Sequence, residues 1–435
     1  MRNKFFFLIL IIIFSTETTF AQEILNLNSA IQLAVKNNYS IGLAADSLAI
    51  SKNNNTYGNA GALPSVFANG GFSIADNNIS QHIATSNTSK SGVISKTYVY
   101  SAGINWTLFN GFKPFATKGR LNLLQHQGEL NIKIQVENLI VQVTKAYFNL
   151  IRAKQALRVT LETISIDDER IKIADTKFTI GSGNKLDLLQ AKVDRNQQES
   201  LILAQRIGID SAKIFLNQLL VRDLKTLFEP MDTSITITYQ PRWENLLDSA
   251  GRNNYLLKAA ATNIRIGEFF VKERRADLFP VLQGIAAYYF SQNINNAGFA
   301  LLNKTSGPQL GLQINWNIFN GRVSRIKLEN AKINLDRVAI NYKSQYSLLL
   351  SNLLAQFISF QNDMVALHLE DENVILAREN LNIALTKYRL GGSTQLELMT
   401  AEQSLESSLN RLVGARYKAK LGEINLLQLS GNLIH

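Results

Sequence analysis

Few side chains in this sequence are suited to catalysis or metal binding, and they do not lie at the spacings that such chemistry requires. The four histidines are scattered along the chain and form no pair at helical spacing: His82, His126, His368 and His435. Because the chain has no cysteine, it cannot form disulfides, thiolate metal sites or a cysteine nucleophile. No nucleophile elbow or paired-carboxylate arrangement is recognisable either. The sequence therefore predicts a protein that is not an enzyme, with no catalytic site, no metal site and no cofactor.

The glycine-rich segment 181–185 has some of the composition of a phosphate-binding loop. Its residues, Gly-Ser-Gly-Asn-Lys, lack the spacing of such a loop, and no strand is predicted before it. The net charge of +11 is spread along the chain, without the block of Lys and Arg that marks a nucleic-acid arm. We therefore expect neither a nucleotide nor a nucleic acid as ligand.

Residues 1–21 have the features of a secretory signal peptide. Arg2 and Lys4 are basic, residues 5–14 are an unbroken apolar run of ten, and cleavage after Ala21 would leave a mature chain without an N-terminal cysteine for lipid attachment. An uncleaved N-terminal anchor is the alternative, although a spanning helix needs ~20 apolar residues. No later segment is apolar enough to cross a membrane as a helix, so strands would have to do so in a membrane protein.

The rest of the sequence consists of two related halves. Residues 104–111, Ile-Asn-Trp-Thr-Leu-Phe-Asn-Gly, recur 210 positions later as residues 314–321, Ile-Asn-Trp-Asn-Ile-Phe-Asn-Gly, with six of eight positions identical. We therefore predict one structural repeat at 22–230 and a second at 231–435. Each repeat would contain short helices, a pair of strands, and two long helices joined by a glycine turn.

Two segments alternate between apolar and neutral polar side chains, as a strand between lipid and water does. The apolar positions of the clearer segment are Leu310, Leu312, Ile314, Trp316 and Ile318. Trp106 and Trp316 lie near the strand ends, where aromatic side chains contact the membrane interface. A soluble sandwich with a buried apolar face is the alternative interpretation.

The predicted strands are about 66–76, 97–109, 281–292 and 308–319. The connections 76–96 and 293–306 are rich in Asn, Ser and Thr, as exposed loops are. Four strands cannot close a membrane barrel, and the smallest such barrels have eight. Several chains must therefore contribute, and the residues alone leave open whether two chains form eight strands or three form twelve.

The predicted long helices are about 112–179, 185–222, 322–390 and 394–429. No proline occurs in 115–229 or 309–435, so nothing there breaks a helix. Apolar residues recur every seven positions, as in a coiled coil: Val136, Val143, Leu150, Leu157, Ile164, Ile171 and Phe178. A helix of ~68 residues would be ~100 Å long, which exceeds a bilayer, so these helices would project into water.

Several of these motifs occur together in one known family. They are the opening Leu25–Ala34, the Pro64 and Pro280 strand entries, the two Trp-x-x-Phe-Asn-Gly strand ends, and the two glycine turns followed by Leu-Asp-Leu or Leu-Glu-Leu. Over essentially the whole mature chain, the sequence resembles the TolC-type outer membrane efflux proteins. The resemblance implies a homotrimer with a shared twelve-stranded barrel in the outer membrane and a long periplasmic helical barrel, which docks with a periplasmic adaptor and an inner-membrane pump.

The resemblance also suggests which residues act at the narrow periplasmic end. Asp187 and Glu397 match the acids that line the family's aperture, and Tyr388 matches a tyrosine that helps to hold it closed. Ser393 and Thr400 replace a basic and an acidic residue of the family, so the constriction is expected to be weaker here. The adaptor-docking turns would comprise Gly181, Ser182, Gly183, Asn184, Gly391, Gly392, Ser393 and Thr394. Asp187 and Glu397 also lie where helix-capping acids do, and both roles are compatible.

The sequence thus predicts a passive outer-membrane exit channel in a tripartite efflux or secretion system of a Gram-negative cell. One alternative is a periplasmic coiled-coil adaptor or scaffold without a pore. Adaptors usually have one helical hairpin per chain and lack the amphipathic strand pairs. A secreted enzyme with a helical appendage is a second alternative, against which the missing catalytic arrangement argues.

Overall fold

The computed structural model describes residues 23–298 and 300–434, so the predicted signal peptide, residues 1–21, lies outside the described residues. The chain divides into two compact units. Unit 1 comprises the chain up to Gly42, Gln135–Asn254 and the chain from Leu349 onward; unit 2 comprises Leu43–Ile134 and Tyr255–Leu348. Each unit therefore contains parts of both sequence repeats, since corresponding segments of the two halves fold together.

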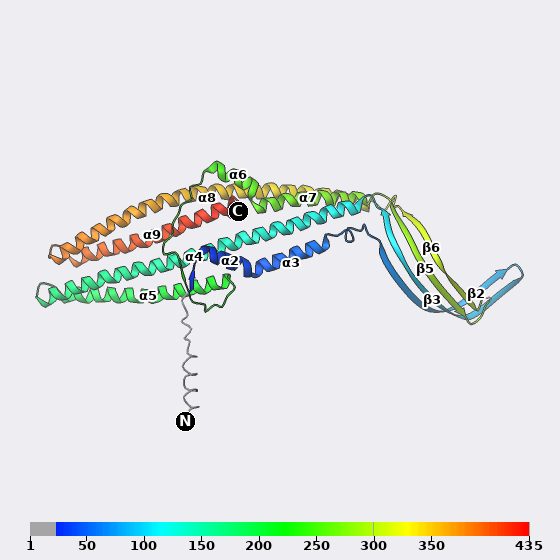
Figure 1. The fold of residues 1–435 in the computed structure, drawn as a ribbon, viewed down its shortest axis with the longest axis horizontal. Helices are drawn as coiled ribbons and strands as arrows, with labels where there is room; N and C mark the ends of the chain where they lie inside the picture. Colours follow the sequence, from blue (N-terminus) through cyan, green and yellow to red (C-terminus); the bar gives the residue numbers. More distant parts are fainter. Residues whose placement is uncertain (1–22, 299, 435) are drawn as a thin grey trace, which may run out of the picture. The chain divides into compact units, whose positions relative to one another are not determined.

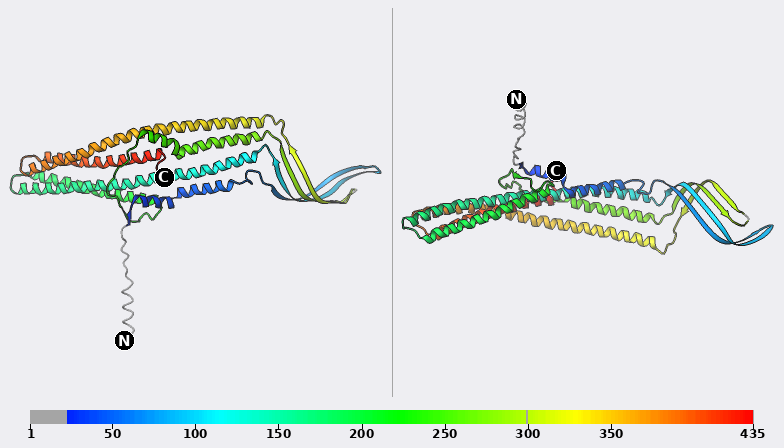
Figure 2. Two further views of the ribbon diagram at one scale, coloured as in Figure 1. Left: turned by 45° about the horizontal axis from the view of Figure 1, so that its top comes forward. Right: turned by 90° about the horizontal axis from the view of Figure 1, so that it is seen from below.

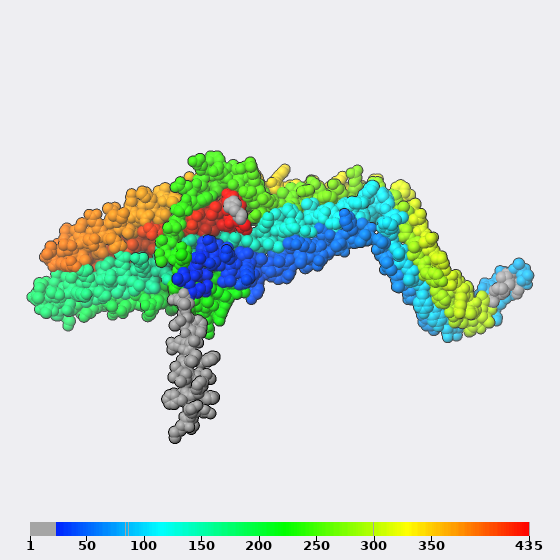
Figure 3. All heavy atoms as spheres, in the orientation of Figure 1, coloured from blue at the N-terminus to red at the C-terminus, as the bar shows by residue number. Residues whose placement is uncertain are grey.

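Four long helices form two hairpins with matching dimensions. Helices α4 (Lys113–Thr179) and α8 (Val323–Arg389) have 67 residues each, and α5 (Lys185–Leu219) and α9 (Gln395–Leu429) have 35 each. In unit 1 the hairpins α4–α5 and α8–α9 lie side by side (Figures 1 and 2). In the space-filling view, α8 and α9 lie directly against α4 and α5 (Figure 3). None of the helices in the described part of the chain is long and apolar enough to cross a membrane.

The predicted seven-residue track of α4 and its counterpart on α8, 210 positions later, supply much of the core of unit 1. Val143 and Leu150 on α4 are fully buried, as is Leu353 on α8, while Phe360 is 3% exposed. At the far end of the α4 track, Phe178 is 41% exposed. Apolar burial along α4 is therefore strongest near its middle and weakens toward the glycine turn.

The short elements repeat as the long helices do. They are β1 (Glu23–Leu25), α2 (Leu27–Asn37), α3 (Tyr39–Asn54), β4 (Phe228–Pro230), α6 (Trp243–Asn253) and α7 (Tyr255–Ala276). Strands β1 and β4 pair in parallel. Asn38, between α2 and α3, donates its side-chain amide to the carbonyl of Leu219 at 3.4 Å; Asn254, between α6 and α7, does the same to Leu429 at 3.1 Å. These two asparagines fasten the ends of α5 and α9 in the same way.

Unit 2 contains a four-stranded antiparallel sheet with the order β2-β3-β5-β6. Its strands are β2 (Ser65–Ile83), β3 (Ser86–Phe109), β5 (Val281–Asn295) and β6 (Leu302–Asn315). Strands β3 and β5 join the two repeats, with Ile104 opposite Ala286. Gly103 is required there, because a Cβ atom at this position would lie 2.5 Å from the Cβ of Ala287. Among the described residues, β2 and β6 each have one neighbouring strand, so the sheet of a single chain has two open edges.

The strands differ in extent from the sequence prediction. The prediction of a loop at 76–96 is wrong, because β2 and β3 stay paired as far as Ile83, which lies opposite Ser86. This pairing could not be predicted from the sequence, because polar side chains on both faces of the strands give no alternation of apolar and polar residues. The pairing itself depends on backbone hydrogen bonds. Conversely, β6 was expected to reach residue 319 but ends at Asn315, opposite Val281. Pro280 precedes β5 and has no N–H group with which to extend the ladder.

Candidate functional site

The two glycine turns have nearly the same local geometry. Gly181 and Gly391 have φ angles of +77° and +78°, a backbone conformation that glycine adopts without strain. Asn184 then caps α5 by accepting a hydrogen bond from the N–H of Leu186 at 3.0 Å. Thr394 caps α9 in a capping box: its hydroxyl accepts from the N–H of Glu397 at 3.3 Å, and Glu397 accepts from the N–H of Thr394 at 3.1 Å.

Tyr388 connects the two turns. Its side chain is only 4% exposed, and its hydroxyl donates to the side-chain oxygen of Gln395 at 3.1 Å. Gln395 in turn donates to the backbone carbonyl of Asp187 at 2.8 Å. Lys177 donates to the backbone carbonyl of Tyr388, and its ammonium nitrogen lies 4.0 Å from the centre of the tyrosine ring. Residues of both turns surround a cavity of about 420 Å³.

The structure therefore brings together Asp187 and Tyr388, two of the residues selected from the sequence. Burial raises the pKa of Tyr388, and the negative charge of Asp187 adds to that rise, which keeps the hydroxyl protonated as a donor. Glu397 has its side chain engaged in the cap of its own helix. Within one chain, the backbone of Asp187 takes part in the contact between the turns, whereas Glu397 acts as a capping residue.

The two tryptophans lie at the start of the connections between sheet and helices. Trp106 is on β3, is 47% exposed, and donates its indole N–H to the carbonyl of Ala62 at 3.0 Å. Trp316 follows β6, is 57% exposed, and donates to the carbonyl of Leu278 at 3.3 Å. Each side chain has an anchored polar atom and an exposed ring, as interface aromatics have.

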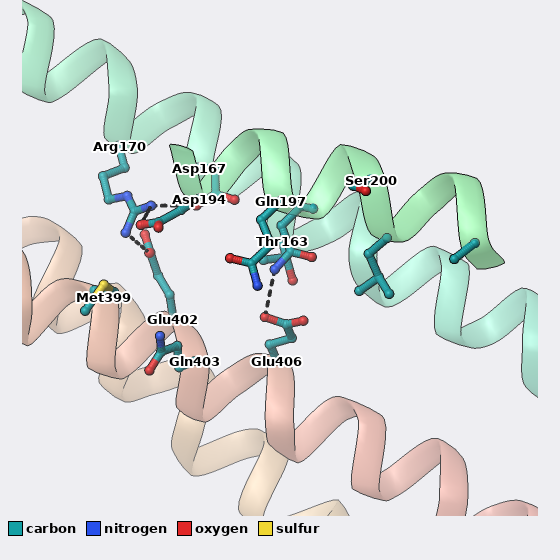
Figure 4. A pocket seen from close by; sticks show the side chains of 13 residues that line it. Thr163, Asp167, Arg170, Asp194, Gln197, Ser200, Met399, Glu402, Gln403 and Glu406 are labelled. Carbon is teal, nitrogen blue, oxygen red and sulfur yellow. Dashed lines mark hydrogen bonds and ion pairs between the residues drawn. The ribbon is translucent and has the colours of Figure 1, made fainter. Parts of the chain in front are cut away.

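A second cluster, which the sequence prediction missed, lies farther along the same helices. Arg170 on α4 is only 1% exposed, and its guanidinium faces three carboxylates (Figure 4). It lies 3.0 Å from an oxygen of Asp167, 2.8 Å from Asp194 of α5 and 2.9 Å from Glu402 of α9. We call these four residues the Arg170 cluster. An open cavity of about 520 Å³ lies beside it, lined mainly by polar side chains of α4, α5 and α9.

Two acids of this cluster, Asp167 and Glu402, have raised pKa values. Burial raises the pKa of Asp167 to about 6 and that of Glu402 to about 7, although the charge of Arg170 opposes both rises. The neighbouring carboxylates add to the rises, because one arginine cannot neutralise three acids. Nearby Glu406 accepts a hydrogen bond from Gln198 at 3.2 Å, and burial raises its pKa as well.

A signal for this cluster was present in the sequence. The second seven-residue track of α4 runs through Leu139, Ala146, Ala153, Thr160, Asp167 and Ala174, and all but Ala153 are buried. The polar residues Thr160 and Asp167 therefore occupy core positions of the coiled coil. A charge at such a position needs a buried partner, which Arg170 provides three residues later.

No group of His, Cys, Asp or Glu side chains in the described part of the chain is arranged to hold a metal ion. The features described are thus two linked helical turns and a buried charge cluster in unit 1, and an open sheet with an exposed apolar face in unit 2.

Comparisons with known proteins agree with this description. The family model for outer membrane efflux proteins matches residues 30–220 and 246–432. The outer membrane efflux protein BepC of Brucella suis is 20% identical over 76% of this chain and 71% of its own length, and the outer membrane protein TolC of Escherichia coli is 20% identical over 68% and 62%. The structure of the outer membrane protein VceC from Vibrio cholerae superposes with a TM-score of 0.73 at 18% identity, covering 93% of this chain and 96% of that one.

The resemblance noted in the sequence is thus confirmed, and the adaptor alternative gains no support. The two matched segments include both strand pairs and all four long helices. The chain belongs to the outer membrane efflux protein family, whose members are outer-membrane exit channels and not enzymes.

Proposed function

We propose that three copies of this chain form one channel, with a twelve-stranded barrel in the outer membrane and a helical tube in the periplasm. The channel would conduct substrates passively from an inner-membrane pump and a periplasmic adaptor to the outside. The observation that carries this proposal is the four-stranded sheet, which has an exposed apolar face and two open edges. The signal peptide would deliver the chain to the periplasm before assembly.

The sheet supports a membrane location and a shared barrel. On β6, Leu310 is 82% exposed, Leu312 73% and Ile314 71%; on β3, Ile104 is 45% exposed. Such a surface is unfavourable in water and favourable against lipid. Unpaired strand edges are not tolerated in lipid, so β2 and β6 require partners, which neighbouring copies would supply. Trp106 and Trp316 would lie at the membrane interface.

The long helices support contacts between copies. An exposed apolar track on α8 has seven-residue spacing and comprises Leu369 (53% exposed), Leu376 (64%) and Ile383 (50%); Leu390 (83%), directly after the end of α8, continues the spacing. Exposed apolar side chains also lie at seven-residue spacing on α5, at Leu186 (66%) and Val193 (59%) and again at Ile207 (67%) and Ile214 (49%), with Ser200 at the position between the two pairs. The seven-residue spacing of these tracks is typical of the contact seam of a coiled coil. The track residues are exposed in the single chain. We propose that they meet between neighbouring copies.

The two glycine turns would form the periplasmic entrance. Three copies of each turn would surround the axis of the tube, where an adaptor would dock. Asp187 and Glu397 follow the turns directly, so six carboxylates would ring the entrance and favour cations. Tyr388 would hold the turns together until the adaptor separates them.

Replacing Asp187 and Glu397 together with alanine should lower the preference for cations and change the single-channel conductance in planar bilayers. The matched control replaces Glu244 and Asp248, two exposed acids of α6, with alanine and therefore removes the same total charge. The control should keep the wild-type selectivity. If both double variants behave like wild type, Asp187 and Glu397 are helix-capping residues only and the entrance is lined by other groups.

A further inference from the structure

The Arg170 cluster joins the two repeats within unit 1. Asp167 and Arg170 belong to α4 and Asp194 to α5, so three members lie on the first helical hairpin, whereas Glu402 belongs to α9 of the second hairpin. Figure 4 shows Glu402 extending toward Arg170, whose other nitrogen faces Asp194. The ion pair between Arg170 and Glu402, at 2.9 Å, is therefore a direct charged contact between the hairpins.

The cluster contains more acid than base. With all groups ionised, one guanidinium faces three carboxylates, which leaves two uncompensated negative charges. One oxygen each of Asp167 and Glu402 is buried without a hydrogen-bond partner among the described residues. The side chains of Asp167 and Glu402 are only 5% and 6% exposed, so water does little to screen this excess.

The charged neighbours do not supply the missing positive charge. On α5, Arg195 pairs with Asp168 at 2.5 Å and with Glu199 at 2.7 Å. Arg378 and Arg389 of α8 pair with Glu162 and Glu169 of α4. Glu406 of α9 brings a further acid to the cavity, and Tyr388 of α8 is neutral. Protonation of Asp167 or Glu402 would reduce this negative charge.

We infer that the Arg170 cluster is a proton-dependent clasp, which holds α9 against the α4–α5 hairpin more tightly when Asp167 and Glu402 are protonated. The role of this clasp at the channel entrance rests on the proposed function. Arg170 is then a positioning residue: it stays charged and fixes the geometry, while the two acids set how firmly the hairpins hold together.

The direction of the pH effect follows from the pKa values of the packed arrangement. The pKa of Asp167 is raised from 3.8 to about 6 and that of Glu402 from 4.5 to about 7, chiefly by burial. If α9 moves away, both acids become hydrated and their pKa values fall toward the ordinary ones. The packed arrangement therefore binds more protons than the separated one between these values. Lowering the pH from about 7 to about 4 therefore favours the arrangement with α9 packed against the α4–α5 hairpin. Raising the pH through about 6 to 7 favours their separation.

The test measures the separation of the two turns as a function of pH. Because the chain has no cysteine, spin labels can be attached to cysteines that replace Ser182 and Gly392, one in each turn. We expect longer and broader distances at pH 8.5 than at pH 5.5 in the full-length protein. The ratio of separated to packed forms should change about tenfold or more, since each pKa shift of one unit corresponds to a factor of ~10.

The variant Glu402→Gln keeps the shape of the side chain and removes one titrating group, so it should flatten the pH profile and stay packed at pH 8.5. Asp167→Asn gives the same test at the other acid if the first variant does not assemble. Asp248→Asn, at an exposed acid of α6, should keep the wild-type profile. A wild-type distance that does not depend on pH, or a Glu402→Gln profile like that of wild type, would overturn the clasp.

These distances do not depend on conduction, which separates the clasp from the proposed function. A channel that conducts while its turns ignore pH would remove the clasp and leave the channel. Turns that move with pH in a protein without conductance would leave the clasp as a feature of the hairpins and remove the channel.

Discussion

Replacing Arg170 with methionine should lower the free energy of unfolding of the full-length protein by about 3–5 kcal/mol, the range for breaking a buried ion pair by removing one partner. Arg170 is 1% exposed and is the shared partner of three acids, so its loss leaves negative charges buried without compensation. Denaturant unfolding in detergent, followed by circular dichroism, measures this loss at pH 7.5.

The matched control is Arg252→Met, because Arg252 is 76% exposed and pairs with the exposed Asp248 on α6. An exposed pair contributes only ~0–1 kcal/mol, so this variant should stay close to wild type. The loss of unfolding free energy in Arg170→Met should also be smaller at pH 5.5 than at pH 7.5, because the remaining acids can then take up protons. Equal losses in the two variants, or a loss that grows as the pH falls, would contradict the structure of the cluster.

Replacing Leu376 and Ile383 with glutamate should prevent the proposed trimer from forming. The two side chains are 64% and 50% exposed in the single chain, so the exchange creates no buried charge within it. In a coiled coil between copies, each glutamate would be buried without a partner, at a cost of several kcal/mol. Light scattering of the detergent-solubilised protein should show single chains.

Asn382→Glu is the control for this experiment, because Asn382 is exposed on the same helix but lies about 100° around it from the apolar track. This variant should remain trimeric. If the glutamate pair at positions 376 and 383 assembles as well as the control does, the exposed track of α8 is not the contact between copies.

Much of the fold could be predicted from the sequence because its periodicities are long and regular. The seven-residue spacing of Val143 and Leu150 shows where α4 packs, and the 210-residue offset extends the argument to α8. The two-residue alternation located the apolar parts of β3 and β6. The polar parts of the strand pairs could not be located, since Asn, Ser and Thr on both faces give no alternating pattern. The end of β6 could not be located either, because it depends on where the neighbouring strand β5 begins.

The site was less accessible to sequence reasoning. The glycine turns and the capping residues are local features, so Asn184 and Thr394 could be recognised from their neighbours. The hydrogen bond from Gln395 to Asp187 and the ion pair between Arg170 and Glu402 join residues more than 200 positions apart. Such contacts depend on how two hairpins pack, and charged residues in a helix otherwise resemble a solvated face.

The most direct test of the channel is the single-channel current of the wild-type protein in planar bilayers. The purified mature protein, folded in detergent and added to one side, should produce small, discrete and cation-selective current steps. Such steps would agree with a closed barrel continued by a narrow, acid-lined tube. The absence of steps from folded and inserted trimers, over repeated additions, would contradict a conducting pore.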